Sequence, residues 1–264
     1  MKTRPLGNTG CLVSPIGLGT VKLGRDQQVK YPYPFTIPGD KEAKNLLATA
    51  RDLGINLIDT APAYGNSEER LGQLLFPERN DWVISTKVGE EFINGQSHFD
   101  FSPEHTRKSI ERSLRRLRTD YLDIVLVHSN GDDLTIINDY GTLDVLNDLK
   151  KAGYIRAFGM STKTVEGGLL AAEKSDVVMI TYNLHYPEEG PVINYAREHN
   201  KGILIKKAFA GGHIFLNGDI KDALAVSMDF IFQHPGGVTS VIAGTIDPGH
   251  LAQILQAATE ALAL

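Results

Sequence analysis

Short apolar runs alternate with longer amphipathic runs along nearly all of the 264 residues, and this alternation constrains the fold more than any other feature. Runs such as DIVLV and DVVMI are rich in β-branched residues and apolar on both faces. This is typical of parallel strands that are covered on both sides. The runs expected as strands are Val13–Leu18, Asn56–Asp59, Trp82–Lys87, Leu122–His128, Ile155–Ser161, Val177–Tyr182, Gly202–Phe209 and Ser240–Gly244.

Helical patterns separate these runs. One opens at Ser102-Pro103-Glu104 and carries an apolar stripe with the spacing of a helix face. Asp40 and Ser67 are the expected caps of two others. The expected helices are Lys41–Asp52, Glu68–Leu75, Ser102–Arg118, Thr142–Lys151, Val165–Ala172, Pro191–His199, Asp219–Phe232 and Pro248–Ala261. Eight such pairs in about 250 residues predict an α/β fold, a single (β/α)8 barrel domain over residues 1–264.

Two segments stand outside the alternation. Residues Gly24–Gly39 include YPYPFTIP, whose prolines exclude a regular helix. This segment follows the first strand, so we expect a loop at the carboxyl ends of the barrel strands, where barrels of this kind carry their sites. The opening TRPLGNTGCLVS has an Asn-Thr-Gly turn between extended pieces, and it predicts a hairpin that closes the opposite, bottom end of the barrel.

Composition excludes several classes of protein. With 42% hydrophobic and 22% charged residues the chain is typical of a soluble globular protein, and its net charge of −5 argues against a nucleic-acid partner. No apolar run approaches the roughly 20 residues of a membrane span, and the start lacks the apolar core of a signal peptide. Cys11 is the only cysteine, which fits a reducing compartment, so we expect a cytoplasmic protein. No sequence motif predicts a metal site.

Polar residues stand at the ends of three neighbouring expected strands. Asp59 ends the second strand and is followed closely by Tyr64, Lys87 ends the third, and His128 ends the fourth. Each residue alone has an ordinary structural explanation, such as a cap, a solvated lysine or a core histidine. Because strand ends of an α/β barrel meet at one rim, we expect the four side chains to converge there.

These four groups suit proton transfer to a carbonyl oxygen. A free tyrosine has a pKa near 10, too high for an efficient acid at neutral pH, and a nearby ammonium lowers it. We therefore expect Lys87 to lower the pKa of Tyr64, Asp59 to hold Lys87, and neutral His128 to donate a hydrogen bond to the carbonyl. Side chains supply no hydride, so a reduction requires a nicotinamide cofactor.

The sequence resembles the aldo-keto reductase family over nearly its whole length. The matching pieces are RPLGNTGCLVSPIGLGT, GINLIDTAPAYGNSEERLG, ISTKVG, FSPEHTRKSIERSLRRLRTDYLDIVLVH and TYNLHYP. The resemblance implies a (β/α)8 barrel that binds NADP(H), with NAD(H) as an alternative, and that reduces small aldehydes and ketones. It also implies a catalytic set of Tyr64, Lys87, Asp59 and His128.

The resemblance further implies which residues contact the cofactor. Ser161-Thr162 stands where the family has Ser-Asn for the nicotinamide carboxamide, and Met179 stands in place of a glutamine. Lys206 stands where an aromatic residue usually stacks on the nicotinamide, with Ile205 and Lys207 as alternatives. His250 occupies the position of the arginine that meets the 2′-phosphate. The full implied set is Gly19, Thr20, Asp59, Ser161, Thr162, Met179, Lys206, Gly244, Thr245, His250 and Gln253.

Two other functions remain open at this stage. One is a nicotinamide-binding regulatory or redox-sensing subunit with little turnover. The other is a lyase in which Lys87 forms a Schiff base, although an ion pair with Asp59 argues against a nucleophilic lysine. The residues identify neither the physiological substrate nor the oligomeric state.

Overall fold

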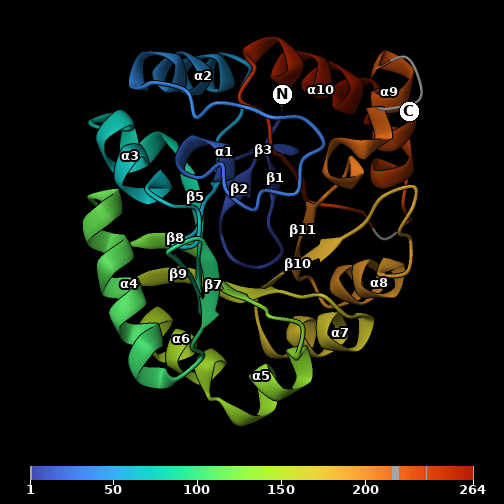
Figure 1. Ribbon diagram of the computed structural model, residues 1–264. Coiled ribbons are helices and arrows are strands. Elements are labelled where there is room, and N and C mark those ends of the chain that lie inside the picture. The colour runs from blue at the N-terminus through green and yellow to red at the C-terminus, as the bar shows by residue number, and fades with distance from the viewer. Residues whose placement is uncertain (1, 216–219, 236, 264) are drawn as a thin grey trace.

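Eight parallel strands close into a barrel, as the alternation predicts (Figure 1). The computed structural model describes residues 2–215, 220–235 and 237–263. Each barrel strand pairs with its neighbours along the chain, and the last pairs with the first. The strands are β3 (Ile16–Gly19), β4 (Leu57–Asp59), β5 (Val83–Val88), β8 (Leu122–His128), β9 (Ile155–Ser161), β10 (Val177–Thr181), β11 (Gly202–Lys206) and β12 (Ser240–Ala243).

Helices form an outer ring around the strands (Figure 1). The ring consists of α2 (Asp40–Asp52), α3 (Ser67–Leu74), α4 (Pro103–Leu117), α5 (Asp133–Asp139), α6 (Thr142–Lys151), α7 (Val165–Lys174), α8 (Gly190–Glu198), α9 (Ile220–Phe232) and α10 (Pro248–Ala261). The single turn α1 (Val21–Gly24) lies inside the ring, directly after β3. Residue 219, the expected start of α9, lies outside the described residues. Two expected caps are wrong by one residue, because Gly39 and Asn66 hold the cap positions of α2 and α3. Among the described residues, no helix is long and apolar enough to cross a bilayer.

The N-terminal hairpin closes one end of the barrel. Its strands are β1 (Arg4–Pro5) and β2 (Leu12–Val13), so Val13 belongs to the hairpin and not to the first barrel strand as the apolar run suggested. Leu6 and Val13 are fully buried and join an apolar cluster with Leu57, Ile124 and Leu204 from the barrel strands. This cluster fills the barrel interior, and the opposite end is left for polar side chains.

Several elements were not expected from the sequence. A second hairpin, β6 (Glu90–Ile93) and β7 (Gln96–Phe99), follows β5, and two short 3-10 helices span Glu78–Asp81 and Ala210–Phe215. The segment after α1 is irregular, as predicted. Its Tyr31 ring lies 3.1 Å from the Lys22 Nζ atom, and Tyr31 also packs beside Gly212 of the segment after β11.

Candidate active site at the carboxyl ends of the strands

Asp59 and Lys87 form a buried ion pair at the ends of β4 and β5. Both Asp59 carboxylate oxygens lie 2.7 Å from Lys87 Nζ, which also donates to the Thr60 carbonyl at 2.9 Å. Lys87 is 1% exposed and Asp59 is 3% exposed. Burial opposes the charged lysine, but Asp59 and Tyr64 favour it, so the pKa of Lys87 is raised. Lys87 is therefore held protonated.

Tyr64 lies beside this pair in the loop between β4 and α3. Its ring centroid is 4.9 Å from Lys87 Nζ and 6.2 Å from the His128 ring, which it meets edge-on. Burial raises the pKa of Tyr64, and the opposing charge of Lys87 does not offset it. The net direction is opposite to the one expected from the sequence, because desolvation of a phenolate cannot be read from residue types.

His128 ends β8 and contacts a residue that the sequence analysis missed. Its Nδ1 atom lies 2.6 Å from Glu90 Oε2, in the hairpin that follows Lys87. Both side chains are largely buried, with exposed fractions of 22% for His128 and 13% for Glu90. The sequence signal was weak: Gly89-Glu90-Glu91 follows a strand that ends in a candidate catalytic lysine.

Lys206 at the end of β11 reaches across to the end of β9. Its Nζ atom donates to Ser161 Oγ at 2.9 Å and to the Thr162 carbonyl at 2.5 Å. Burial lowers the pKa of Lys206 to about 7, while Glu189 of the β10–α8 connection opposes this effect. The fully buried Thr162 Oγ1 has no hydrogen-bond partner among the described residues. Lys206, Ser161 and Thr162 are thus brought together, but Thr162 Oγ1 faces α7, where a Cβ atom on Gly168 would lie 3.5 Å from it.

Met179 differs from these residues in its surroundings. It is 2% exposed and belongs to the apolar cluster inside the barrel, with Leu204 and Val177. A thioether in such a cluster is at most a weak hydrogen-bond acceptor. Only the Met179 backbone has a polar role here, because its carbonyl accepts from Thr162 N at 3.1 Å.

Gly19 and Gly244 meet where β3 and β12 end. A Cβ atom on Gly19 would lie 3.5 Å from the Gly244 Cα atom. Thr20 is fully buried, and its hydroxyl donates to the Asp59 carbonyl at 2.9 Å and accepts from Ser67 Oγ at 2.9 Å. Its side chain therefore fixes the position of β3 relative to β4 next to the ion pair.

The start of α10 is capped by a carboxylate. Asp247 Oδ1 accepts from His250 N at 2.9 Å, and Thr245 Oγ1 accepts from Asp247 N at 3.1 Å. His250 and Gln253 are both exposed on this helix. The resemblance implies that the N-terminus of α10 binds the cofactor phosphate. In this chain the same N-terminus already carries the negative charge of Asp247.

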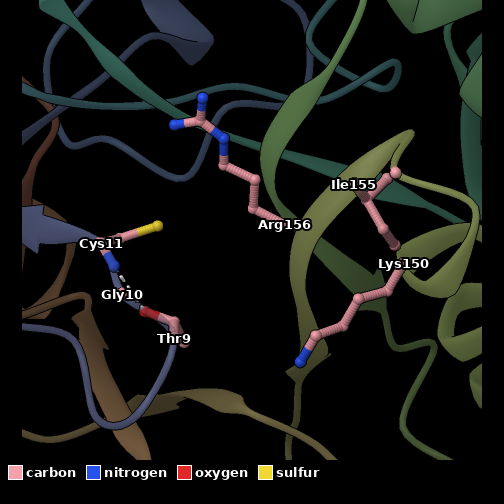
Figure 2. Close-up of a pocket in the computed structure, with 7 residues that line it drawn as sticks. Thr9, Gly10, Cys11, Lys150, Ile155 and Arg156 are labelled. Atoms are coloured by element: carbon pink, nitrogen blue, oxygen red, sulfur yellow. Dashed lines mark hydrogen bonds between the residues drawn. The ribbon is translucent and has the colours of Figure 1, made fainter.

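A separate pocket lies at the other end of the barrel (Figure 2). It is lined by Thr9, Cys11 and the cations Lys150 and Arg156, which are paired with Asp176 at 2.7 Å and Asp123 at 3.1 Å. Burial raises the pKa of the Cys11 thiol, so this thiol is held neutral. The pocket therefore offers no free charge or activated nucleophile, and the candidate site is the rim around Lys87. The described part of the chain holds no cluster of three metal-ligating side chains.

Comparison with known proteins adds independent evidence. The profile of the Aldo/keto reductase family matches residues 15–225. A Pseudomonas aeruginosa protein, provisionally described as an aldo-keto reductase, has a solved structure that is 55% identical and superimposes with a TM-score of 0.90. The superposition covers 98% of this chain and 95% of that one.

Two curated relatives also match. Aldo-keto reductase YhdN of Bacillus subtilis is 31% identical over 244 residues, which are 89% of this chain and 69% of that protein. The NADH-specific methylglyoxal reductase of Escherichia coli is 36% identical over 175 residues, 60% of this chain and 51% of that protein. The matched region thus spans about half to two thirds of the length of these relatives.

Proposed function

The chain belongs to the aldo/keto reductase family, and from this premise we propose that it reduces small aldehydes or ketones to alcohols with NADP(H), NAD(H) being the alternative cofactor. The observation that carries the proposal is the buried Asp59–Lys87 pair beside Tyr64 at the rim of the barrel. This arrangement holds a cation next to a phenol, which suits a site that donates a proton to a carbonyl oxygen.

Each of the four side chains has a separate task in this proposal. Tyr64 donates its phenolic proton to the carbonyl oxygen as that oxygen gains negative charge. Lys87 opposes the rise in the pKa of Tyr64 that burial causes, and it stabilises the phenolate that remains. Asp59 holds Lys87 in position, and His128 orients the carbonyl oxygen. A bound nicotinamide supplies the hydride that reduces the carbonyl carbon.

The residues at the ends of β9, β11 and β12 fit a nicotinamide cofactor. Ser161 Oγ, which accepts from Lys206 Nζ, is the candidate hydroxyl group for a carboxamide. Asp59 is expected near the same ring. Gly244 leaves its backbone exposed at the end of β12, next to the buried Gly19, and Thr245, His250 and Gln253 are candidates for the phosphate end. The Met179 side chain can make only an apolar contact with the cofactor.

The test combines a reduction assay with cofactor binding. We expect the purified protein to oxidise NADPH or NADH in the presence of a panel of aldehydes. Tyr64→Phe should lose about 10²–10⁴-fold in turnover, because the phenol acts only in the transition state. Its cofactor dissociation constant, measured by fluorescence titration, should stay within about twofold. A Tyr64→Phe variant that keeps more than half of the turnover would contradict the assigned role.

The same panel decides between an enzyme and a regulatory nicotinamide-binding subunit, for which we expect tight cofactor binding without turnover. Borohydride in the presence of substrate tests the Schiff-base alternative, because it would trap an amine adduct on Lys87. We expect no adduct. Because Cys11 is the only cysteine, we also propose a cytoplasmic location, and fractionation of the native cells tests it.

A further inference from the structure

Arg25 lies between the two loops that follow β4 and β5. It comes directly after α1, and its Nη1 atom donates to the carbonyl of Ala63, the residue before Tyr64, at 2.9 Å. Its guanidinium carbon lies 4.2 Å from the centroid of the Phe92 ring, in the hairpin of β6 and β7 that follows β5. These contacts hold the guanidinium beside the candidate proton donor.

This cation has no acidic partner of its own among the described residues. Its side chain makes one hydrogen bond, to Ala63, and no carboxylate lies within 4.0 Å of it. Glu90 is near enough to raise the pKa of Arg25, but its carboxylate accepts from Ser97 Oγ at 2.6 Å and lies 2.6 Å from His128 Nδ1. A partly desolvated cation without a counter-ion carries a cost that a bound anion removes.

The end of the guanidinium is the part that a ligand can reach. The Nε atom of Arg25 is enclosed and unpartnered, whereas the Nη2 atom is neither enclosed nor hydrogen-bonded to the described residues. A guanidinium stays charged at every physiological pH, and two of its N–H groups can meet the two oxygens of one carboxylate. The Phe92 ring against the guanidinium restricts its movement, so the group is prepared for an anion.

Arg25 lies across the rim from the residues that fit the cofactor. Those residues stand at the ends of β9, β11 and β12, whereas Arg25 contacts the loops after β4 and β5. In the closed strand order β10-β11-β12-β3-β4-β5-β8-β9, β4 and β5 lie opposite β10 and β11. An anion at Arg25 therefore belongs to the carbonyl substrate, whose oxygen meets Tyr64 in the proposed reduction.

We propose that Arg25 binds a carboxylate of the substrate, so that the enzyme prefers aldehydes and ketones that also carry an acid group to neutral carbonyl compounds. The proposal rests on the proposed reductase function for its kinetic consequence. The carboxylate is remote from the reacting carbon and is held equally before and during the reaction. Its contribution should therefore appear in KM and leave kcat nearly unchanged.

Matched pairs of aldehydes test this preference. We expect kcat/KM for formylbenzoate to exceed that for formylbenzamide, which has the same shape without the charge, by about 10–100-fold, the range of a hydrogen bond to a charged group. Arg25→Met keeps an apolar stem against Phe92 and removes the charge, so KM for the acid should rise by about the same factor. The amide reports folding, because its kcat/KM should stay within about twofold. Arg25→Lys keeps the charge without the paired geometry and should retain only part of the preference.

Lys30→Met is the matched control, because Lys30 is exposed on the same segment and carries the same charge. It should leave the preference for the acid unchanged, which separates direct contact from long-range attraction. Equal kcat/KM for the acid and the amide in the wild type overturns the proposal. So does a preference that persists in Arg25→Met.

Binding without turnover provides a second readout. Ligand-detected NMR with benzoate and benzamide needs neither cofactor nor reaction. Benzoate should bind the wild type more tightly than benzamide does, formylbenzoate should displace it, and the difference should disappear in Arg25→Met. Benzoate that fails to bind the wild type, or that binds both proteins equally, contradicts the proposal. Absence of turnover together with binding of benzoate that depends on Arg25 contradicts only the proposed function.

Discussion

At the scale of single residues, the two lysines of the rim have opposite surroundings. Lys87 donates to three oxygens, two of them from Asp59, and its pKa is raised. Lys206 donates only to uncharged oxygens, and burial lowers its pKa to about 7. A nucleophilic amine needs a free lone pair, and Lys87 lacks one because it is held protonated. Lys87 is therefore not suited to form a Schiff base.

We expect Lys87→Met to abolish most carbonyl reduction. Without the ammonium, nothing on β5 opposes the rise in the pKa of Tyr64 that burial causes, and Tyr64 becomes a weaker acid. The loss should fall on kcat and amount to about 10²–10⁴-fold, which is the usual contribution of general acid catalysis. Steady-state kinetics at neutral pH measure this loss.

Lys150→Met is the matched control for this variant. Lys150 is also paired with a carboxylate, Asp176, but it lines the pocket at the hairpin end of the barrel. It should leave kcat unchanged. Full activity of Lys87→Met would mean that another group activates the phenol.

At the scale of elements, the position of Tyr64 depends on two glycines in close contact. A Cβ atom on Gly24, at the end of α1, would lie 2.1 Å from the Tyr64 carbonyl oxygen. A Cβ atom on Gly65 would lie 2.0 Å from the Gly24 carbonyl oxygen, and Gly65 has a φ of +62°. The loop that carries Tyr64 can approach α1 only because both side chains are absent.

Gly24→Ala should therefore separate α1 from the Tyr64 loop. We expect a loss of about 1–3 kcal/mol in the free energy of unfolding, the usual cost of overpacking, measured by urea denaturation. Gly244→Ala should be nearly neutral, because nothing lies within 4 Å of its added Cβ atom. If both variants unfold at the same urea concentration as the wild type, the close contact does not constrain this loop.

At the scale of the whole molecule, cofactor choice depends on charge at the start of α10. This helix contains no lysine or arginine, and Asp247 places a carboxylate at its N-terminus beside His250. Because the helix offers no permanent cation to a 2′-phosphate, we expect only a modest preference for NADPH over NADH.

Two variants distinguish the contributions of His250 and Asp247 to the choice between NADPH and NADH. His250→Ala should bring the two dissociation constants closer together without changing NADH affinity. Asp247→Asn keeps a capping side chain and removes a negative charge, so it should strengthen NADPH binding only. Fluorescence titrations with both cofactors measure these changes. A large NADPH preference that His250→Ala leaves unchanged would exclude His250 as the recognising group.

The barrel and the rim positions of Asp59, Lys87 and His128 could be predicted from the order of the residues alone. Periodicity is a local property, and strand order in a closed parallel barrel follows chain order, so polar residues at successive strand ends must meet. The sequence also predicted the N-terminal hairpin at the opposite end of the barrel. It assigned Val13 to the first barrel strand, however, whereas Val13 lies in β2 of the hairpin.

The electrostatics of the site, in contrast, depend on the folded arrangement and could not be predicted from the residues. Glu90 contacts His128 from an unexpected hairpin, and Lys206 of β11 reaches past β10 to Ser161 of β9, 45 residues away in the chain. Burial raises the pKa of Tyr64 although Lys87 is near. These outcomes depend on how much water packing removes from each group, and on contacts between distant segments. Desolvation is a property of the folded surroundings, so no pattern of residue types along the chain encodes it locally.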